Sequence, residues 1–228
     1  MVYEIEAQEF EIYPFALVRT PYAYLNSALQ QTIKGGKHQP FIGLGANILQ
    51  GLQHNTKNTK LPSSVPAIRK LLDIFDKSIH FYPFKTATSD PGGPVSFVLK
   101  TILKQSNVNK FELATANQSL SNLTTRVKNM LNNELRHIDS GALKKLIYEL
   151  DSQKNSERFL LTRHEFQSIE ESFKKIQANM DQLLGDQFTK EKIQFSDTKS
   201  LEDINQNLVS LSKGLYKFAV GSNDCKKN

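Results

Sequence analysis

The sequence predicts a mainly α-helical protein, with a helical bundle or short coiled coil in its C-terminal half and a small α+β unit in its N-terminal half. Three observations lead to this fold class. Three segments of the C-terminal half space their apolar residues by alternate steps of three and four, as packed helices do. The first residues instead alternate apolar and polar side chains and are rich in Val, Ile, Phe and Tyr, as strands are. Between these regions, segments with recognisable helix starts are separated by turns that contain Gly and Pro.

The chain is long enough, at 228 residues, to hold one large domain or two small ones with a buried core. Hydrophobic residues make up 39% of it, which is well above the depletion typical of disordered chains. The change of pattern predicts a basic, mainly helical unit over 1–105, a helical bundle or short coiled coil over 109–220, and a polar tail over 221–228.

In the N-terminal half, the opening predicts one or two strands that are broken near Tyr13 and Pro14. Short helices are expected over 22–33 and 40–53, and a longer one from Ser63 or Ser64 to about Ile79, with Pro66 in its first turn. Further segments are then expected in chain order: an extended stretch over 80–84, a loop over 86–94 and a helix over 94–105.

In the C-terminal half, heptad-like helices are expected over 113–130, 166–184 and 201–218, with a shorter helix around 143–150. Thr162 and Glu165 form the spacing of a capping box before the second of these helices, and Gly185 stands where a terminating glycine belongs. The first of these helices carries neutral flanks of poor helix propensity, which favours burial on more than one side.

The apolar stripes of these helices can close the core of this chain, pair with another chain, or do both. We therefore expect a non-enzymatic assembly or adaptor subunit, which binds partner helices or forms a homo-oligomer. The residues expected to bind partners are Leu113, Leu120, Leu123, Val127, Phe166, Ile169, Phe173, Ile176, Met180, Leu201, Ile204, Leu208, Leu211 and Leu215. A membrane-active helix is a third alternative, but the mixed charges around the stripe at 166–184 do not favour anionic lipid.

The second alternative is nucleic-acid binding, because the net charge of +6 is concentrated in the N-terminal half. Residues 12–110 carry 12 basic and three acidic residues, with aromatic side chains among them, as single-strand binding surfaces have. The candidate anion-binding residues are Arg19, Lys34, Lys37, Lys57, Lys60 and Lys85. The turn from Lys34 to Lys37 could also hold an anion in a nest of backbone N–H groups.

The sequence contains no recognisable catalytic, metal-binding or nucleotide-binding pattern, so no enzyme activity, cofactor or small-molecule substrate is expected. The Gly43-Leu-Gly45 start lacks the third glycine of a dinucleotide loop, and none of the five histidines has another at i, i+4. No signal peptide or membrane-spanning segment is evident. An intrachain disulfide is not expected, because Cys225 is the single cysteine. These features favour an intracellular protein, in cytoplasm or nucleus, but they identify neither its partner nor its oligomeric state.

Overall fold

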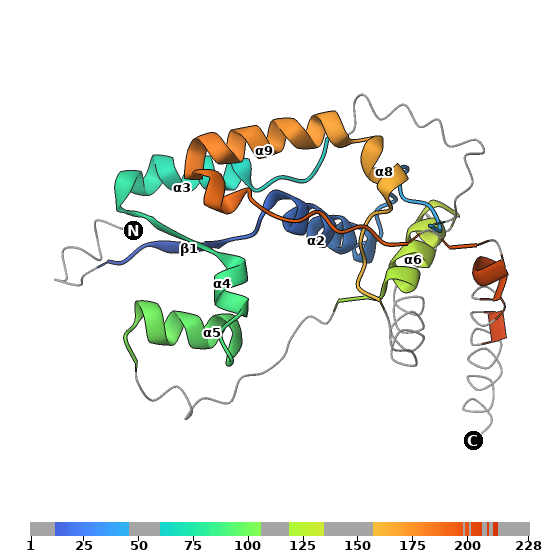
Figure 1. Cartoon of the computed structure of the whole chain (residues 1–228), viewed down its shortest axis with the longest axis horizontal. Helices are drawn as coiled ribbons and strands as arrows, with labels where there is room; N and C mark the ends of the chain where they lie inside the picture. Colours follow the sequence, from blue (N-terminus) through green and yellow to red (C-terminus); the bar gives the residue numbers. More distant parts are fainter. Residues whose placement is uncertain are drawn as a thin grey trace, which may run out of the picture. The chain divides into compact units, whose positions relative to one another are not determined.

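The computed structural model describes residues 12–45, 60–105, 119–134, 157–197, 199–200, 202–206, 209 and 212–213. These residues are mainly helical and include a two-stranded parallel sheet (Figure 1). The elements are, in chain order, β1 (Phe15–Val18), α2 (Pro21–Lys34), α3 (Val65–Phe75), the 3-10 helix η2 (Asp76–Ser78), β2 (His80–Pro83), α4 (Phe84–Thr88), α5 (Gly93–Phe97), the π-helical turn η3 (Val98–Ile102), α6 (Asn122–Glu134), α8 (Arg163–Gln167), α9 (Glu170–Leu184) and the 3-10 helix η5 (Asp186–Phe188).

The chain divides into two compact units, and each unit is assembled from separated segments. Unit 1 comprises Met1–Leu25, Leu61–Ala116 and Glu171–Lys192, and unit 2 comprises Asn26–Lys60, Asn117–Glu170 and Ile193–Asn228. We expected a division along the chain between residues 105 and 109. Each unit instead takes segments from both sides of that position, because residues far apart in the chain pack together.

The parallel sheet of unit 1 is formed by strands that lie more than 60 residues apart in the sequence. Phe15 pairs with His80 and Val18 pairs with Pro83. Because side chains alternate along a strand, one face of the sheet carries Val18 and Phe81, and this face covers the core of unit 1. The core contains these buried or partly buried residues: Val18, Val65, Ile68, Leu72, Phe81, Ile176, Met180, Leu183, Leu184 and Phe188.

Two helices of unit 1 confirm local signals in the sequence. Helix α3 begins after Ser64 with a proline in its first turn, and Val65 and Ile68 on its apolar face are buried. Helix α9 runs alongside α3 (Figure 1), and Arg69 of α3 donates a hydrogen bond to Asn179 of α9. Helix α9 is followed directly by Gly185, whose φ of 87° lies in the left-handed region that favours glycine.

The first turn of α2 is held by a carboxylate from the far end of unit 1. Glu191 accepts hydrogen bonds from the Thr20 hydroxyl (2.5 Å) and from the Tyr22 backbone N–H (2.7 Å). The bond from Tyr22 occupies a backbone N–H that a helix start leaves without an intrahelical partner. Burial raises the pKa of Glu191, and the hydrogen bonds from Thr20 and Tyr22 oppose that rise.

The stripe at 166–184 lies on two helices rather than on the single helix that we expected. Helix α8 ends at Gln167, where the N–H of Ile169 bonds to the Phe166 carbonyl three residues back. The Ser168 hydroxyl donates a hydrogen bond to the carbonyl of Glu165, and α9 begins at Glu170. The capping box before α8 is confirmed, with Thr162 accepting from the N–H of Glu165 and Glu165 accepting from the N–H of Thr162.

Three other expected elements differ from the structure. Within the helix expected over 40–53, residues 40–45 are not helical, and the rest lies outside the described residues. Residues 86–88 belong to α4, although they were expected in a loop. Helix α6 begins at Asn122, with the hydroxyl of Ser121 accepting from the N–H of Thr124. Leu120 therefore precedes the helix, and residues 113–118 and 143–150 lie outside the described residues.

Candidate functional site

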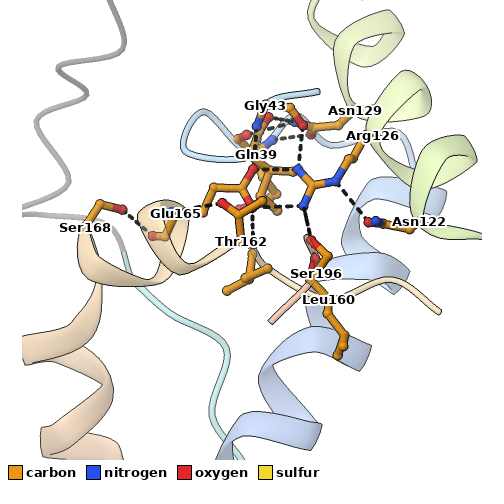
Figure 2. Close-up of polar contacts among 12 residues, drawn as sticks. Gln39, Gly43, Asn122, Arg126, Asn129, Leu160, Thr162, Glu165, Ser168 and Ser196 are labelled. Carbon is orange, nitrogen blue, oxygen red and sulfur yellow. Dashed lines mark hydrogen bonds and ion pairs between the residues drawn. The ribbon is translucent and has the colours of Figure 1, made fainter. Parts of the chain in front are cut away.

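The most connected group of polar side chains in the structure surrounds Arg126 in unit 2. Arg126 of α6 forms a bidentate ion pair with Glu165 of α8, with N···O distances of 2.5 and 3.0 Å (Figure 2). Its remaining N–H groups donate to the side chain of Asn122 (2.9 Å) and to the carbonyls of Gly43 (2.7 Å) and Leu160 (3.0 Å). The Arg126 and Glu165 side chains are 2% and 8% exposed, so the pair is buried.

Every hydrogen-bonding group of this ion pair is already used within unit 2. All five N–H groups of the guanidinium have an acceptor, and each oxygen of Glu165 accepts from Arg126 and from one backbone N–H. These two backbone donors are Gly43 (3.0 Å) and Thr162 (2.8 Å). A saturated, buried pair has no capacity to bind a ligand, so we assign it a structural role: it joins α6, α8 and the loop at 43.

The side-chain amides of α6 fasten the end of α2 and the loop that follows it. Asn129 donates to the carbonyls of Gln39 and Ile42, and its oxygen accepts from the N–H of Gln39. Asn132 donates to the carbonyls of Ile33 and Lys37. Asn122, Arg126, Asn129 and Asn132 of α6 are therefore buried with hydrogen-bond partners. Of the uncharged flanking residues expected to be buried, Asn122 and Thr125 are buried, and 113–118 lie outside the described residues.

The turn from Lys34 to Lys37 does not form the anion-binding nest that we considered. The N–H groups of Gly35, Gly36 and Lys37 donate to the carbonyls of Gln31, Ile33 and Thr32 at the end of α2. This arrangement satisfies carbonyls that a helix end leaves open. The three N–H groups are consequently not available to an anion.

Unit 1 exposes an ordered aromatic surface on the side of the sheet opposite its core. We call this surface the aromatic face; it comprises Tyr13, Phe15, His80 and Tyr82. Tyr13 and Phe15 are 45% and 36% exposed. The ring of Tyr13 stacks on His80, with centroids 4.5 Å apart and planes 6° apart. The hydroxyls of Tyr13 and Tyr82 share a hydrogen bond of 2.8 Å, so the side chains are held in defined positions.

The aromatic face is supported from within unit 1. The ring of Phe97 from α5 meets Tyr82 edge to face, with centroids 5.7 Å apart. The hydrogen bond with Tyr13, together with burial, raises the pKa of Tyr82. The guanidinium of Arg19 lies 4.3 Å from the centre of the Phe84 ring, which places a cation beside the next aromatic residue of the chain.

The structure places most of the described stripe residues inside the chain itself. Those that are buried are Leu120, Val127, Phe166, Ile169, Phe173, Met180 and Ile204. Leu123 and Ile176 are half-buried, and Leu113, Leu201, Leu208, Leu211 and Leu215 lie outside the described residues. Phe173 packs edge to face against Tyr22, with ring centroids 6.1 Å apart. The chain thus covers these side chains, and their binding to partner helices stays a prediction.

The candidate anion-binding residues are divided between the two units. Arg19 and Lys85 belong to unit 1, whereas Lys34, Lys37 and Lys60 belong to unit 2. Lys37, Lys60 and Lys85 are exposed, and Lys57 lies outside the described residues. No single basic patch can therefore be assigned to this set within either unit.

Sequence reasoning did not identify the Arg126 centre or the aromatic face. A signal for the first was present: Asn122, Arg126, Asn129 and Asn132 recur at steps of four, three and three, which is a polar stripe on one side of a helix. For the second, the sequence predicts only that His80–Phe84 is extended. Its position beside Tyr13 depends on strand pairing, for which the sequence carries no local signal.

Within the described part of the chain, no group of three or more His, Cys, Asp and Glu side chains could hold a metal ion. No helix there combines the length and the apolar character that crossing a membrane requires. Comparison with known proteins found no matching family model, no matching curated protein and no matching solved structure.

Proposed function

We propose that this chain is a non-enzymatic assembly or adaptor subunit that binds a partner protein at the aromatic face of unit 1. The observation that carries this proposal is the ordered exposure of aromatic rings on the sheet, opposite the core of the unit. Folding alone gains little from holding Tyr13 and Phe15 in water, since such residues contribute stability mainly when they are buried.

The geometry of the aromatic face suits protein recognition. Binding loses conformational entropy when side chains become fixed, and the stack of Tyr13 on His80 and the Tyr13–Tyr82 hydrogen bond fix these side chains in advance. Tyrosine is also among the residue types that contribute most to binding free energy at interfaces. The mixed polar and apolar character of Tyr13 and His80 allows the surface to remain in water before a partner binds.

The helix stripes are the less supported binding surface. Phe166, Phe173 and Met180 are already buried, so a partner helix would have to displace contacts within the chain. The helical bundle or short coiled coil expected over 109–220 likewise stays a prediction, as does oligomer formation.

The test compares two triple variants in native purification followed by quantitative mass spectrometry. Tyr13→Ser/Phe15→Ser/His80→Ser alters the aromatic face. Its matched control, Ile74→Ser/Val95→Ser/Leu103→Ser, removes three exposed apolar side chains elsewhere in unit 1, each more than half exposed. We expect one protein to copurify with the wild type and with the control, and to be depleted at least tenfold with the aromatic-face variant. Equal recovery with both variants would contradict the proposal.

A second candidate function is single-stranded nucleic-acid binding by the same unit. Stacked aromatic rings beside cations bind unpaired bases, and unit 1 provides the aromatic face, Arg19 over Phe84 and the exposed Lys85. This function predicts binding of a single-stranded oligonucleotide that weakens steeply with salt and is lost in the Tyr13→Ser/Phe15→Ser/His80→Ser variant. Absence of binding at low salt would exclude it.

A further inference from the structure

The small sheet of unit 1 has an unpaired edge along β1. The sheet contains β1 and β2 alone, so each strand has one neighbour among the residues that the structure describes. The N–H of His80 donates to the carbonyl of Pro14 at 3.0 Å, which fixes the side of β1 that faces β2. Successive residues of a strand direct their backbone groups to opposite edges, so Phe15 and Leu17 direct theirs away from β2. The N–H and C=O groups of these two residues therefore line the outer edge of β1.

This outer edge is accessible at the end that adjoins the aromatic face. Phe15 is 36% exposed and Leu17 is half-buried, whereas Val18 at the other end of the strand is buried. Within the described part of the chain, no other backbone group pairs with the backbone of Phe15 or Leu17. The outer edge of β2 is less suited to pairing, because Pro83 has no N–H to donate. An extended chain that adds to this sheet therefore pairs with β1.

The surroundings of the edge favour an acidic segment. Residues 12–34, which include β1, contain no aspartate or glutamate, and neither do residues 77–89, which include β2. Arg19 directly after β1 and the exposed Lys85 after β2 supply positive charge. Glu191 offsets part of this charge, but its oxygens already accept hydrogen bonds from the residues around the start of α2. Carboxylates on the added segment therefore complement this part of unit 1.

We propose that β1 takes an added strand from the partner protein: an extended, acidic segment that pairs with the backbone of Phe15 and Leu17. This inference rests on the function proposed above, since it states how the partner binds beside the aromatic face. Main-chain hydrogen bonds give such a strand addition its affinity, and alternate side chains give it specificity. Every second side chain of the segment lies on the side of Tyr13 and Phe15, where aromatic or apolar residues can pack against these exposed rings.

The first test uses a synthetic peptide of about six residues, a common strand length, that alternates tyrosine with glutamate. Binding to the full chain is followed by magnetic resonance, and the amide signals of Phe15 and Leu17 should shift. A control peptide with a methyl group on every backbone nitrogen should bind about tenfold more weakly, since its hydrogen-bond donors are removed. Equal binding of the methylated peptide would overturn the proposal. A peptide with lysine in place of glutamate should also bind more weakly, and equal binding would overturn the acidic character of the segment.

Amide hydrogen exchange tests the edge itself, without any substitution. In the protein without peptide, the N–H groups of Phe15 and Leu17 should exchange faster than those of Ala16 and Val18, which face β2. Addition of the tyrosine–glutamate peptide should then protect Phe15 and Leu17. Slow exchange of these two groups before the peptide is added would overturn the proposal, because another segment of this chain or a second copy would already occupy the edge.

The last test separates this inference from the function proposed above. Leu17→Pro removes an N–H from the outer edge and keeps every residue of the aromatic face; an edge strand tolerates proline where its N–H points outward. We expect the copurifying partner to be lost with Leu17→Pro and retained with Leu17→Ile, which keeps the N–H. Recovery of the partner with Leu17→Pro, together with its loss in the aromatic-face variant, would overturn the strand addition and leave the proposed function standing. Recovery with both variants would contradict the proposed function as well.

Discussion

Glu165→Gln is the substitution that tests most directly how unit 2 is held together. It removes the negative charge that lies against the buried guanidinium of Arg126 and changes few atoms. Each oxygen of Glu165 accepts two N–H groups, one from Arg126 and one from the backbone of Gly43 or Thr162. Whichever way the new amide is oriented, its NH₂ group faces two N–H donors, so hydrogen bonds are lost along with the charge.

The expected magnitude follows from the burial of both partners. Because Arg126 and Glu165 are only 2% and 8% exposed, solvent does not screen the loss. Leaving one charge of a buried pair without its partner typically costs about 3–5 kcal/mol. A typical domain has a free energy of unfolding of about 5–15 kcal/mol, so the substitution should remove a large part of the stability of unit 2.

The assay is urea unfolding followed by circular dichroism, with amide hydrogen exchange to locate the change. Glu157→Gln is the matched control, because Glu157 forms an ion pair with Lys199 in the same unit, at 3.3 Å, with side chains 60% and 35% exposed. An exposed pair contributes about 0–1 kcal/mol, so the control should unfold almost as the wild type does. In Glu165→Gln, the N–H groups of Gly43 and Thr162 should exchange much faster, since their acceptor is impaired.

A specific result would refute this account of the Arg126 centre. If Glu165→Gln and Glu157→Gln differ by less than about 1 kcal/mol in the free energy of unfolding, the ion pair is not the main connection between α6 and α8. Unchanged exchange at Gly43 and Thr162 would lead to the same conclusion.

Three further predictions concern unit 1. Phe173→Ala should destabilise the protein by about 3–5 kcal/mol in urea unfolding, because Phe173 is buried. Phe15→Ala on the aromatic face should cost less than about 1 kcal/mol in the same assay. Equal losses in the free energy of unfolding would contradict the assigned core. Gly185→Ala should cost about 1–3 kcal/mol in the same assay through its positive φ alone, since no atom lies within 4 Å of the added Cβ; a neutral result would contradict the strain argument. Burial raises the pKa of Glu191, so the folded protein binds the proton of this carboxyl more tightly than the unfolded chain does. The contribution of Glu191 to stability is therefore complete below the ordinary glutamate pKa of about 4.3 and is lost as pH rises through the raised pKa. The Tm of Glu191→Gln should lack this fall with pH, and parallel pH profiles of the two proteins would refute the prediction.

Several elements could be predicted because their signals are local. Helix α2 matches the helix expected over 22–33 to within one residue at each end, and α3 starts where Ser64 and Pro66 indicate. The capping box at Thr162 and the end at Gly185 are also confirmed. A helix start or stop is determined by residues within about one turn, so a short stretch of sequence contains the information.

The partners of the buried faces could not be predicted in the same way. The spacing of Phe166, Phe173 and Met180 correctly indicated a buried stripe, but it did not reveal that Met180 meets Val18 and Val65 in unit 1. An apolar face is compatible with any apolar surface, since the hydrophobic effect has no direction. The sequence therefore predicts which side of a helix is buried, and the folded chain decides what covers it.

Arg126 shows the same division for a polar side chain. By its residue type it would be expected at the surface, because arginine is rarely fully buried. Its burial depends on Glu165, Asn122 and the carbonyls of Gly43 and Leu160, which meet only after helix α6, the loop at Gly43 and the stretch from Leu160 to Glu165 have packed together. The sequence by itself determined the mainly helical class and the local starts and stops of its helices. The tertiary structure decided the parallel pairing of β1 with β2, the aromatic face and the buried ion pair, because each of these requires residues that lie tens of positions apart in the chain.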